Sequence, residues 1–121
     1  MYKTDILRGK SLNFAVRVYR LSTYLREEFD EYVISKQVLR SGTSIGANIA
    51  ESKRAETPAD FVHKMGIAEK ECEETLFWLD LMERVDLINN VQHDSMHKDC
   101  EELLKILASS SVTVKKNLSR Q

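Results

Sequence analysis

The chain has few of the residues that interrupt helices or cross-link small domains: its 121 residues include one proline, four glycines and two cysteines. The scarcity of proline and glycine favours long helices, within a single domain that spans residues 1–121. Two cysteines cannot build a disulfide framework, which excludes the class of small disulfide-stapled secreted domains. We therefore expect a protein of the reducing cytoplasm.

Long apolar runs and a surplus of one charge are also missing. No apolar stretch approaches the roughly 20 residues that a membrane-spanning helix needs, and the first ten residues have no signal-peptide core, so we expect no membrane partner. The 18 basic and 19 acidic side chains leave a formal net charge of −1. Because dedicated nucleic-acid binders are usually basic, this balance argues against strong, general binding of RNA or DNA, although a local basic patch stays open.

Helix-start signals divide the chain into four helical segments. The predicted helices span residues 7–28, 36–55, 58–85 and 92–118. Ser35 is the predicted N-cap of the second helix, and Thr57 caps the third, with Pro58 and Asp60 in its first turn. An Asn-Asn pair beginning at Asn89 predicts a turn before the fourth. Short loops between long helices favour antiparallel neighbours, so the expected fold class is all-α, an antiparallel up-down-up-down four-helix bundle.

The segment from residue 37 to residue 51 carries two stripes of short side chains. Gly42, Gly46 and Ala50 recur every four residues and let another helix approach closely. The polar residues on the other side are Ser41, Ser44, Asn48, Glu51 and Ser52. An exposed helix face would usually carry long charged side chains. We therefore expect this helix to be in contact on more than one side, which indicates assembly.

Apolar residues cover more than one face of the first and third predicted helices. On the first, Phe14 and Val18 belong to the core stripe, while Leu12, Val16 and Tyr19 form a second stripe beside it. Extra apolar surface on a small chain usually marks a protein interface, and closed symmetric homo-oligomers are common. We therefore predict that the chain binds copies of itself. The alternative is a tightly packed monomer with some exposed apolar side chains.

The second strip of the third helix contains Glu71, Glu74 and Trp78. Carboxylates on a contact face need partners. Candidate partners, in the same chain or in a neighbouring subunit, are Arg40, Arg54 and Asn48. A binding site at the two glutamates is the alternative. The residues predicted to hold helix packing and subunit contacts are Ser41, Ser44, Asn48, Glu51, Glu71, Glu74 and Trp78.

Basic side chains gather at two places. Lys10, Arg17 and Arg20 share one edge of the first helix, and Lys115, Lys116 and Arg120 cluster at the C-terminus. A solvated surface is the ordinary interpretation of such residues. The alternative is a contact strip for RNA or DNA, which repetition around an oligomer would enlarge.

Candidate catalytic and metal-binding residues are few. His93, His97 and Glu101 share a helix face as metal ligands would, but no second ligand cluster has an obvious spacing, so no metal and no cofactor are predicted. Cys72 and Cys100 fall on core faces, where thiols are usually inert. The sequence shows no nucleophile–base motif or carboxylate pair suited to acid–base chemistry. We therefore predict no catalytic residues and no enzymatic activity.

Two segments together resemble a known family. QVLRSGTSIGANIAES (residues 37–52) and AEKECEETLFWLDLM (residues 68–82) are similar to signatures of the four-helix bundle proteins encoded in 23S rRNA intervening sequences. These are also described as ribosomal-protein relatives, and the family includes accessory proteins of diversity-generating retroelements. The resemblance spans at least residues 12–82. It implies a bundle that assembles into a closed ring, a homopentamer, and it supplies no catalytic residues that could be carried over to this chain.

The residues and the resemblance lead to one functional hypothesis and one alternative. The hypothesis is a cytoplasmic, non-enzymatic homo-oligomer that serves as an adaptor, with RNA or a nucleoprotein as a candidate partner. The candidate nucleic-acid contacts are Lys10, Arg17, Arg20, Lys53 and Arg54. The alternative is a protein-only docking scaffold that binds no nucleic acid. The retroelement accessory proteins are basic, and the mildly acidic balance of this chain departs from them.

Overall fold

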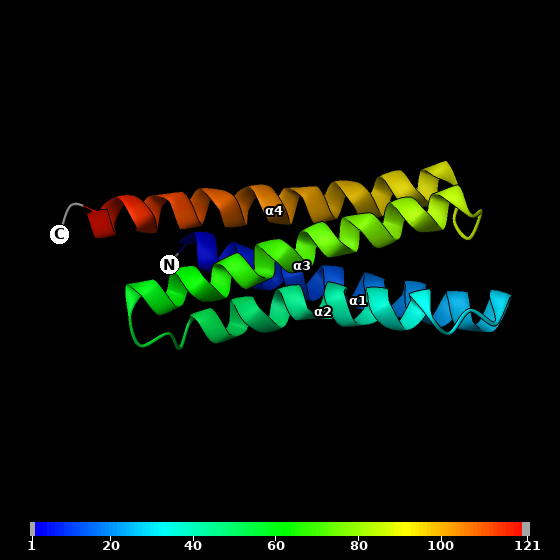
Figure 1. Cartoon of the computed structure of the whole chain (residues 1–121), viewed down its shortest axis with the longest axis horizontal. Coiled ribbons are helices and arrows are strands. Elements are labelled where there is room, and N and C mark those ends of the chain that lie inside the picture. Colours follow the sequence, from blue (N-terminus) through cyan, green and yellow to red (C-terminus); the bar gives the residue numbers. More distant parts are fainter. Residues whose placement is uncertain (1, 120–121) are drawn as a thin grey trace.

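The computed structural model describes residues 2–119, which form four α-helices (Figure 1). They are α1 (Tyr2–Phe29), α2 (Ile34–Ser52), α3 (Pro58–Arg84) and α4 (Asn90–Ser119). No strand occurs within the described residues, so the prediction of an all-α class with four helices is confirmed. Over the same residues, no helix has both the length and the apolar character needed to span a bilayer.

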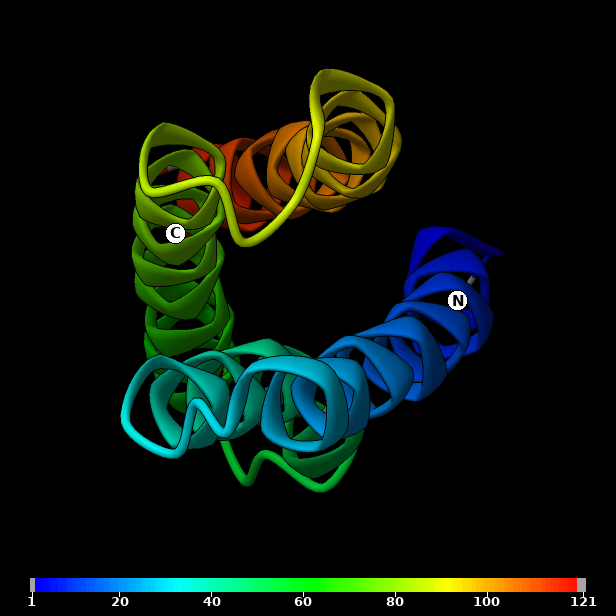
Figure 2. The ribbon, with the colours of Figure 1, turned by 90° about the vertical axis from the view of Figure 1, so that its right-hand side faces the viewer.

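Consecutive helices lie side by side, and the loops that join them stand at alternating ends of the molecule (Figure 1). Seen end-on, the helices surround a common centre, with α1 and α4 on either side of the most open edge (Figure 2). The contact between α1 and α4 is the least extensive of the four helix–helix contacts. Two ion pairs bridge it: Arg17 of α1 lies 2.5 Å from Asp99 of α4, and Lys10 pairs with Glu102.

The core is built from the apolar stripes that the helical periodicity predicts. Phe14 and Val18 of α1 are buried together with Ile45 of α2. Cys72 and Cys100 are fully buried, as predicted, and the Cys100 thiol donates to the Cys72 carbonyl at 3.5 Å. Since burial of apolar surface is the main favourable term in folding, this shared core is what holds the helices together.

The start of α2 differs from the prediction. The helix begins at Ile34, and Val33 stands at the cap position without a capping side chain. Ser35 is buried inside the first turn, where its hydroxyl donates to the Glu31 carbonyl at 2.6 Å. The Glu31 carboxylate accepts from the Ser35 N–H at 3.0 Å and so supplies the missing cap. The predicted N-cap at Ser35 is therefore wrong, because a carboxylate in the preceding loop takes that role.

The N-terminal ends of α3 and α4 are set by local capping residues. Thr57 accepts a hydrogen bond from the N–H of Asp60, and Pro58 opens α3, as predicted. Before α4, Asn89 and Gln92 exchange hydrogen bonds between side chain and backbone N–H, each at 2.8 Å. This reciprocal arrangement is a capping box. With this cap, α4 begins at Asn90, two residues before the predicted start at residue 92.

Candidate functional site

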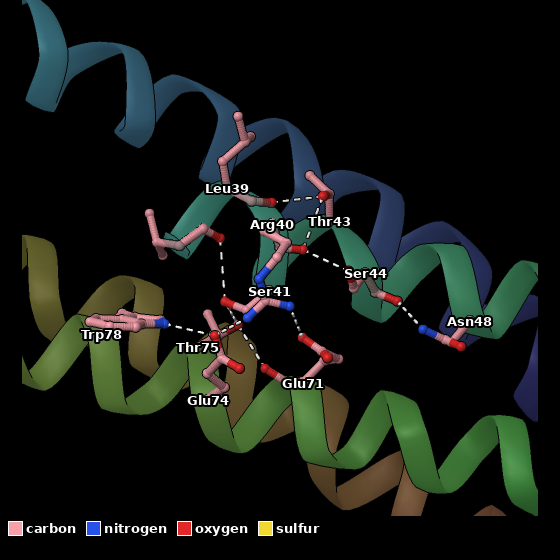
Figure 3. Close-up of polar contacts among 11 residues, drawn as sticks. Leu39, Arg40, Ser41, Thr43, Ser44, Asn48, Glu71, Glu74, Thr75 and Trp78 are labelled. Carbon is pink, nitrogen blue, oxygen red and sulfur yellow. Dashed lines mark hydrogen bonds and ion pairs between the residues drawn. The ribbon is translucent and has the colours of Figure 1, made fainter. Parts of the chain in front are cut away.

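The polar face of α2 lies against α3 of the same chain (Figure 3). At its centre, Thr75 Oγ1 donates to the carbonyl of Glu71 at 2.8 Å and lies 2.9 Å from Ser41 Oγ. Because the single hydroxyl proton of Thr75 goes to the backbone, Ser41 is the donor between the two hydroxyls. Both residues are fully buried. Short polar side chains thus satisfy their hydrogen bonds while the helices approach closely.

Arg40 joins α2 to the carboxylate pair on α3 (Figure 3). Its guanidinium donates to Glu71 at 3.3 Å and also to Glu74, so of the candidate partners Arg40 is the one in place. The indole N–H of Trp78 donates to Glu74 at 2.9 Å. This bond lowers the pKa of Glu74; burial opposes the shift, and Arg40 reinforces it. The unit is partly open to solvent, so its ion pairs are worth at most about 1 kcal/mol each.

The other predicted interface residues of α2 use their polar groups within the chain. Ser44 donates to the Arg40 carbonyl at 2.7 Å, and Asn48 donates to the Ser44 carbonyl at 2.8 Å. Each of these bonds runs four residues back along the helix. Glu51 is exposed, and its carboxylate lies 3.6 Å from the ammonium of Lys64 on α3. A second copy is not needed to explain these contacts.

The glycine stripe on the other side of α2 faces α1. A Cβ at Gly42 would stand 2.7 Å from both γ-methyl groups of Val18, and a Cβ at Gly46 would stand 3.3 Å from the hydroxyl of Ser11. The predicted close approach of a helix is therefore present, and the approaching helix is α1 of the same chain. Ala50, the third member of the stripe, is exposed. Since α1 and α3 cover the two stripes of α2, these stripes do not by themselves require assembly.

Three of the five candidate nucleic-acid residues are paired with carboxylates of the chain. The pairs are Lys10–Glu102, Arg17–Asp99 and Lys53–Asp5. The Glu102 carboxylate raises the pKa of Lys10 through its hydrogen bond. Within residues 2–119, Arg20 and Arg54 have no ion pair or side-chain hydrogen bond. Acidic residues of α4 thus neutralise much of the basic edge of α1, which a projection of α1 alone cannot reveal.

The second apolar stripe of α1 is exposed. Leu12, Val16 and Tyr19 leave 65%, 43% and 59% of their surface in solvent. At 100° per residue, this stripe lies well away from the edge of α1 that faces α4. On α3, Phe77 is 58% exposed and meets the ring of Trp78 edge-on, with centroids 5.1 Å apart. Both surfaces are available to a partner.

A cavity of about 710 Å³ opens at the end of the bundle where the first turns of α1, the α2–α3 loop and the last turns of α4 meet. Phe61, Val114 and Leu118 line it and are only partly buried, although their spacing continues the apolar stripes of α3 and α4. The core therefore stops short of this end. Lys53 also lines the cavity, but its ammonium is paired with Asp5.

Neither cysteine is placed to act as a nucleophile. The Cys100 side chain, together with burial, raises the pKa of the Cys72 thiol. A reactive cysteine needs the opposite: a lowered pKa and access to solvent. Both thiols are fully buried, so they behave as small apolar side chains.

Comparison with known proteins identifies relatives of this chain. Residues 4–109 match the family described as 23S rRNA-intervening sequence protein. The chain is also similar to a crystal structure of a protein of unknown function from the S23 ribosomal protein family of Bacteroides thetaiotaomicron. The two share 47% sequence identity with a TM-score of 0.89, and the alignment covers 90% of this chain and 97% of that one. No curated protein has a significant match. The chain therefore belongs to the family of 23S rRNA-intervening sequence proteins.

Proposed function

We propose that the chain forms an antiparallel up-down-up-down bundle whose copies assemble into a closed ring and act as a non-enzymatic cytoplasmic adaptor. The observation that carries the proposal is the exposed apolar stripe of Leu12, Val16 and Tyr19 on α1. Its members stand four and three residues apart, which is the spacing with which one helix face packs into the groove of another. The family resemblance adds the expectation of five subunits.

The free energy gained by burying this stripe alone is too small for a stable contact, so the proposed contact includes further apolar surface. A fully buried large apolar side chain is worth roughly 1.5–3 kcal/mol, and about half of each stripe residue is available, so one stripe yields on the order of 3 kcal/mol. Association costs at least that much in lost freedom. Phe77 supplies apolar surface on a different helix. A contact between two unlike surfaces closes into a ring when the rotation between subunits permits it.

A structural role agrees with the state of the polar groups. Ser41, Thr75 and Glu74 are engaged in packing α2 against α3, and the thiols of Cys72 and Cys100 are buried. None of these groups is both accessible and placed beside a general base, which nucleophilic catalysis requires. The chain therefore fits a role in binding partners better than a role in catalysis.

Light scattering and sedimentation velocity at micromolar concentration test the assembly. We expect a particle several times heavier than the 14.0 kDa chain. Val16→Lys combined with Tyr19→Lys should lower the mass, because two ammonium groups would be desolvated in the contact. Val112→Lys, on a comparably exposed valine of α4, is the matched control and should leave the mass unchanged. A wild-type particle of 14.0 kDa would remove the proposal.

A second candidate function, contact with RNA, is favoured by one observation. Arg20 and Arg54 are exposed and, within the described residues, have no carboxylate partner. Repetition of two unneutralised cations around a ring would build a larger positive surface. The other candidate cations would first have to leave their carboxylates, so Arg20 and Arg54 would carry most of the affinity.

Filter binding with a structured RNA and with single-stranded DNA separates the two candidates. If RNA is bound, affinity should fall steeply with salt, and Arg20→Gln with Arg54→Gln should reduce the slope of that dependence by about 2. Lys105→Gln, on an exposed lysine of α4, is the control. If neither nucleic acid binds at low salt, the RNA-contact function is excluded and the protein-only docking scaffold is the function that remains.

A further inference from the structure

Two helices bring their nitrogen and oxygen ligands together near the loop between α3 and α4. His93 Nε2 of α4 lies 2.8 Å from Asp80 Oδ1 of α3. His97 Nε2, one turn further along α4, lies 3.9 Å from the same oxygen. The two imidazole centroids are 5.0 Å apart. Two ring nitrogens from one helix thus converge on one carboxylate from another.

Each imidazole is also oriented by a carboxylate on its far side. His93 Nδ1 lies 2.9 Å from Asp94 Oδ1, and His97 Nδ1 lies 2.8 Å from Glu101 Oε1. A carboxylate can only accept, so each of these contacts places a proton on Nδ1. By the same rule, His93 Nε2 shares a proton with Asp80 in the metal-free state, and a bound metal ion would displace that proton. In the neutral ring that remains, the protonated Nδ1 faces its carboxylate and Nε2 carries a lone pair. This is the arrangement found behind metal-bound histidines, where the outer carboxylate fixes both tautomer and ring direction.

We propose that Asp80, His93 and His97 bind a divalent transition-metal ion of the zinc type, which links α3 to α4. The three ligand atoms lie within 4.8 Å of one another. Around a tetrahedral zinc ion with bonds of about 2.0–2.1 Å, neighbouring ligand atoms stand about 3.3 Å apart. The observed separations of 2.8 and 3.9 Å bracket that spacing. Small side-chain rotations are therefore enough to seat the ion.

The surroundings match the charge of such an ion. The carboxylates of Asp80, Asp94 and Glu83 lie 2.8, 2.9 and 3.6 Å from the ring nitrogens of His93 and surround it with a negative field. The same negative field favours a divalent cation. The His93 side chain is 12% exposed and that of Asp80 is 60% exposed. Because the site is open on the side of Asp80, water or a further ligand completes the coordination.

The ligand types select the class of metal. Two imidazoles and one carboxylate suit zinc and its neighbours, whereas calcium and magnesium prefer all-oxygen sites. Cys72 and Cys100 are fully buried and the structure places neither in this cluster. The inference does not depend on the oligomer, since all three ligands come from one chain.

Zinc titration of the full chain, purified without a histidine tag, tests the site by calorimetry and thermal unfolding. We expect one ion per chain and a rise in Tm on saturation. His93→Gln, His97→Gln and Asp80→Asn should each weaken binding at least tenfold and remove the rise in Tm. The matched controls are His63→Gln and Glu73→Gln, which alter exposed residues of α3 outside the cluster and should leave both readouts unchanged.

Cobalt(II) and one positioning variant complete the experiment. Bound cobalt should show visible d–d bands without the thiolate charge-transfer band that cysteine ligation would produce. Glu101→Gln should leave the Tm of the metal-free protein unchanged and lower zinc affinity about 10- to 100-fold, as loss of an outer carboxylate does. No binding at 1 mM zinc, undiminished binding by His93→Gln, equal weakening by His63→Gln, or a thiolate band would each overturn the proposal.

Discussion

Replacing Gly42 with alanine should destabilise the fold, even though alanine is the better helix former. The added Cβ would stand 2.7 Å from both γ-methyl groups of Val18. Real Cβ contacts are not that short, so α1 and α2 would have to move apart or Val18 would have to change rotamer. Val18 is fully buried, and a β-branched side chain in a helix has one strongly preferred rotamer. Either adjustment would therefore lower the free energy of unfolding.

The magnitude follows from two opposing terms. The higher helix propensity of alanine contributes about 1 kcal/mol in favour of the variant. Overpacking a tight core costs about 1–3 kcal/mol, and the contact with two methyl groups of a stiff, buried side chain places Gly42→Ala near the upper end. We therefore expect a net loss of about 2 kcal/mol, which is large against the total stability of a small domain.

Gly66→Ala is the matched control, because a Cβ there would meet nothing within 4 Å. It adds the same methyl group to the interior of another helix and should stabilise the protein by up to about 1 kcal/mol. Urea unfolding followed by circular dichroism should thus separate the variants by about 3 kcal/mol. The protein concentration must be the same throughout, since the proposed assembly would couple stability to concentration.

A double-mutant cycle with Val18→Ala identifies the clash as the cause. Removing both γ-methyl groups makes room for the new Cβ, so Gly42→Ala should cost much less in the Val18→Ala background than in the wild type. Contacting residues typically show a coupling energy of about 0.5–3 kcal/mol, and we expect a value in that range here. If Gly42→Ala were as stable as the wild type, or if the two changes were simply additive, close packing between α1 and α2 would not explain the glycine.

Two further predictions concern capping and pH. Asn89→Ala should lower stability by about 1 kcal/mol, because it breaks the reciprocal bonds with Gln92; urea midpoints measure this, and Asn13→Ala, on an exposed residue of α1, should change little. Since the pKa of Glu74 is lowered in the folded state, its contribution is complete above the ordinary glutamate value of about 4.3 and is lost as the pH falls through the folded pKa. Glu74→Gln should therefore lose less stability on acidification than the wild type, with Trp78 fluorescence as the probe; equal losses would contradict this.

The sequence predicts helix starts only where the signal is local. Thr57 and Pro58 act on the next few residues of their own helix, so the predicted start of α3 agrees with the structure. The start of α2 depends on Glu31, a loop residue four positions before the buried Ser35. A serine before an apolar run fits the N-cap pattern, but the geometry of a four-residue loop decides which side chain reaches the free N–H groups. That geometry comes from how α1 and α2 pack.

The same distinction between local and long-range signals applies to the residues of the proposed metal site. The spacing of His93 and His97 places them on one helix face, which the sequence shows directly. Asp80 lies on another helix, and its position opposite them depends on the register of α3 against α4. That register is set by the intervening loop, where Asp86 adopts a left-handed φ of 62°. Because aspartate at such a position leaves no clear sequence signal, the third residue of the proposed site is found only from the structure.

The arrangement of surfaces has a consequence for the assembly. Both stripes of α2 are used inside the chain, so in the proposed assembly a second copy would contact the outer faces of α1 and α3. The joint between α1 and α4 is the least extensive, and exposed ion pairs such as Arg17–Asp99 contribute at most about 1 kcal/mol each. A neighbour that packs on the stripe around Val16 would therefore add apolar contacts to one of the two helices that meet at this least extensive joint. Assembly and folding would then be coupled, and α1 should show the largest gain in hydrogen-exchange protection as the protein concentration rises.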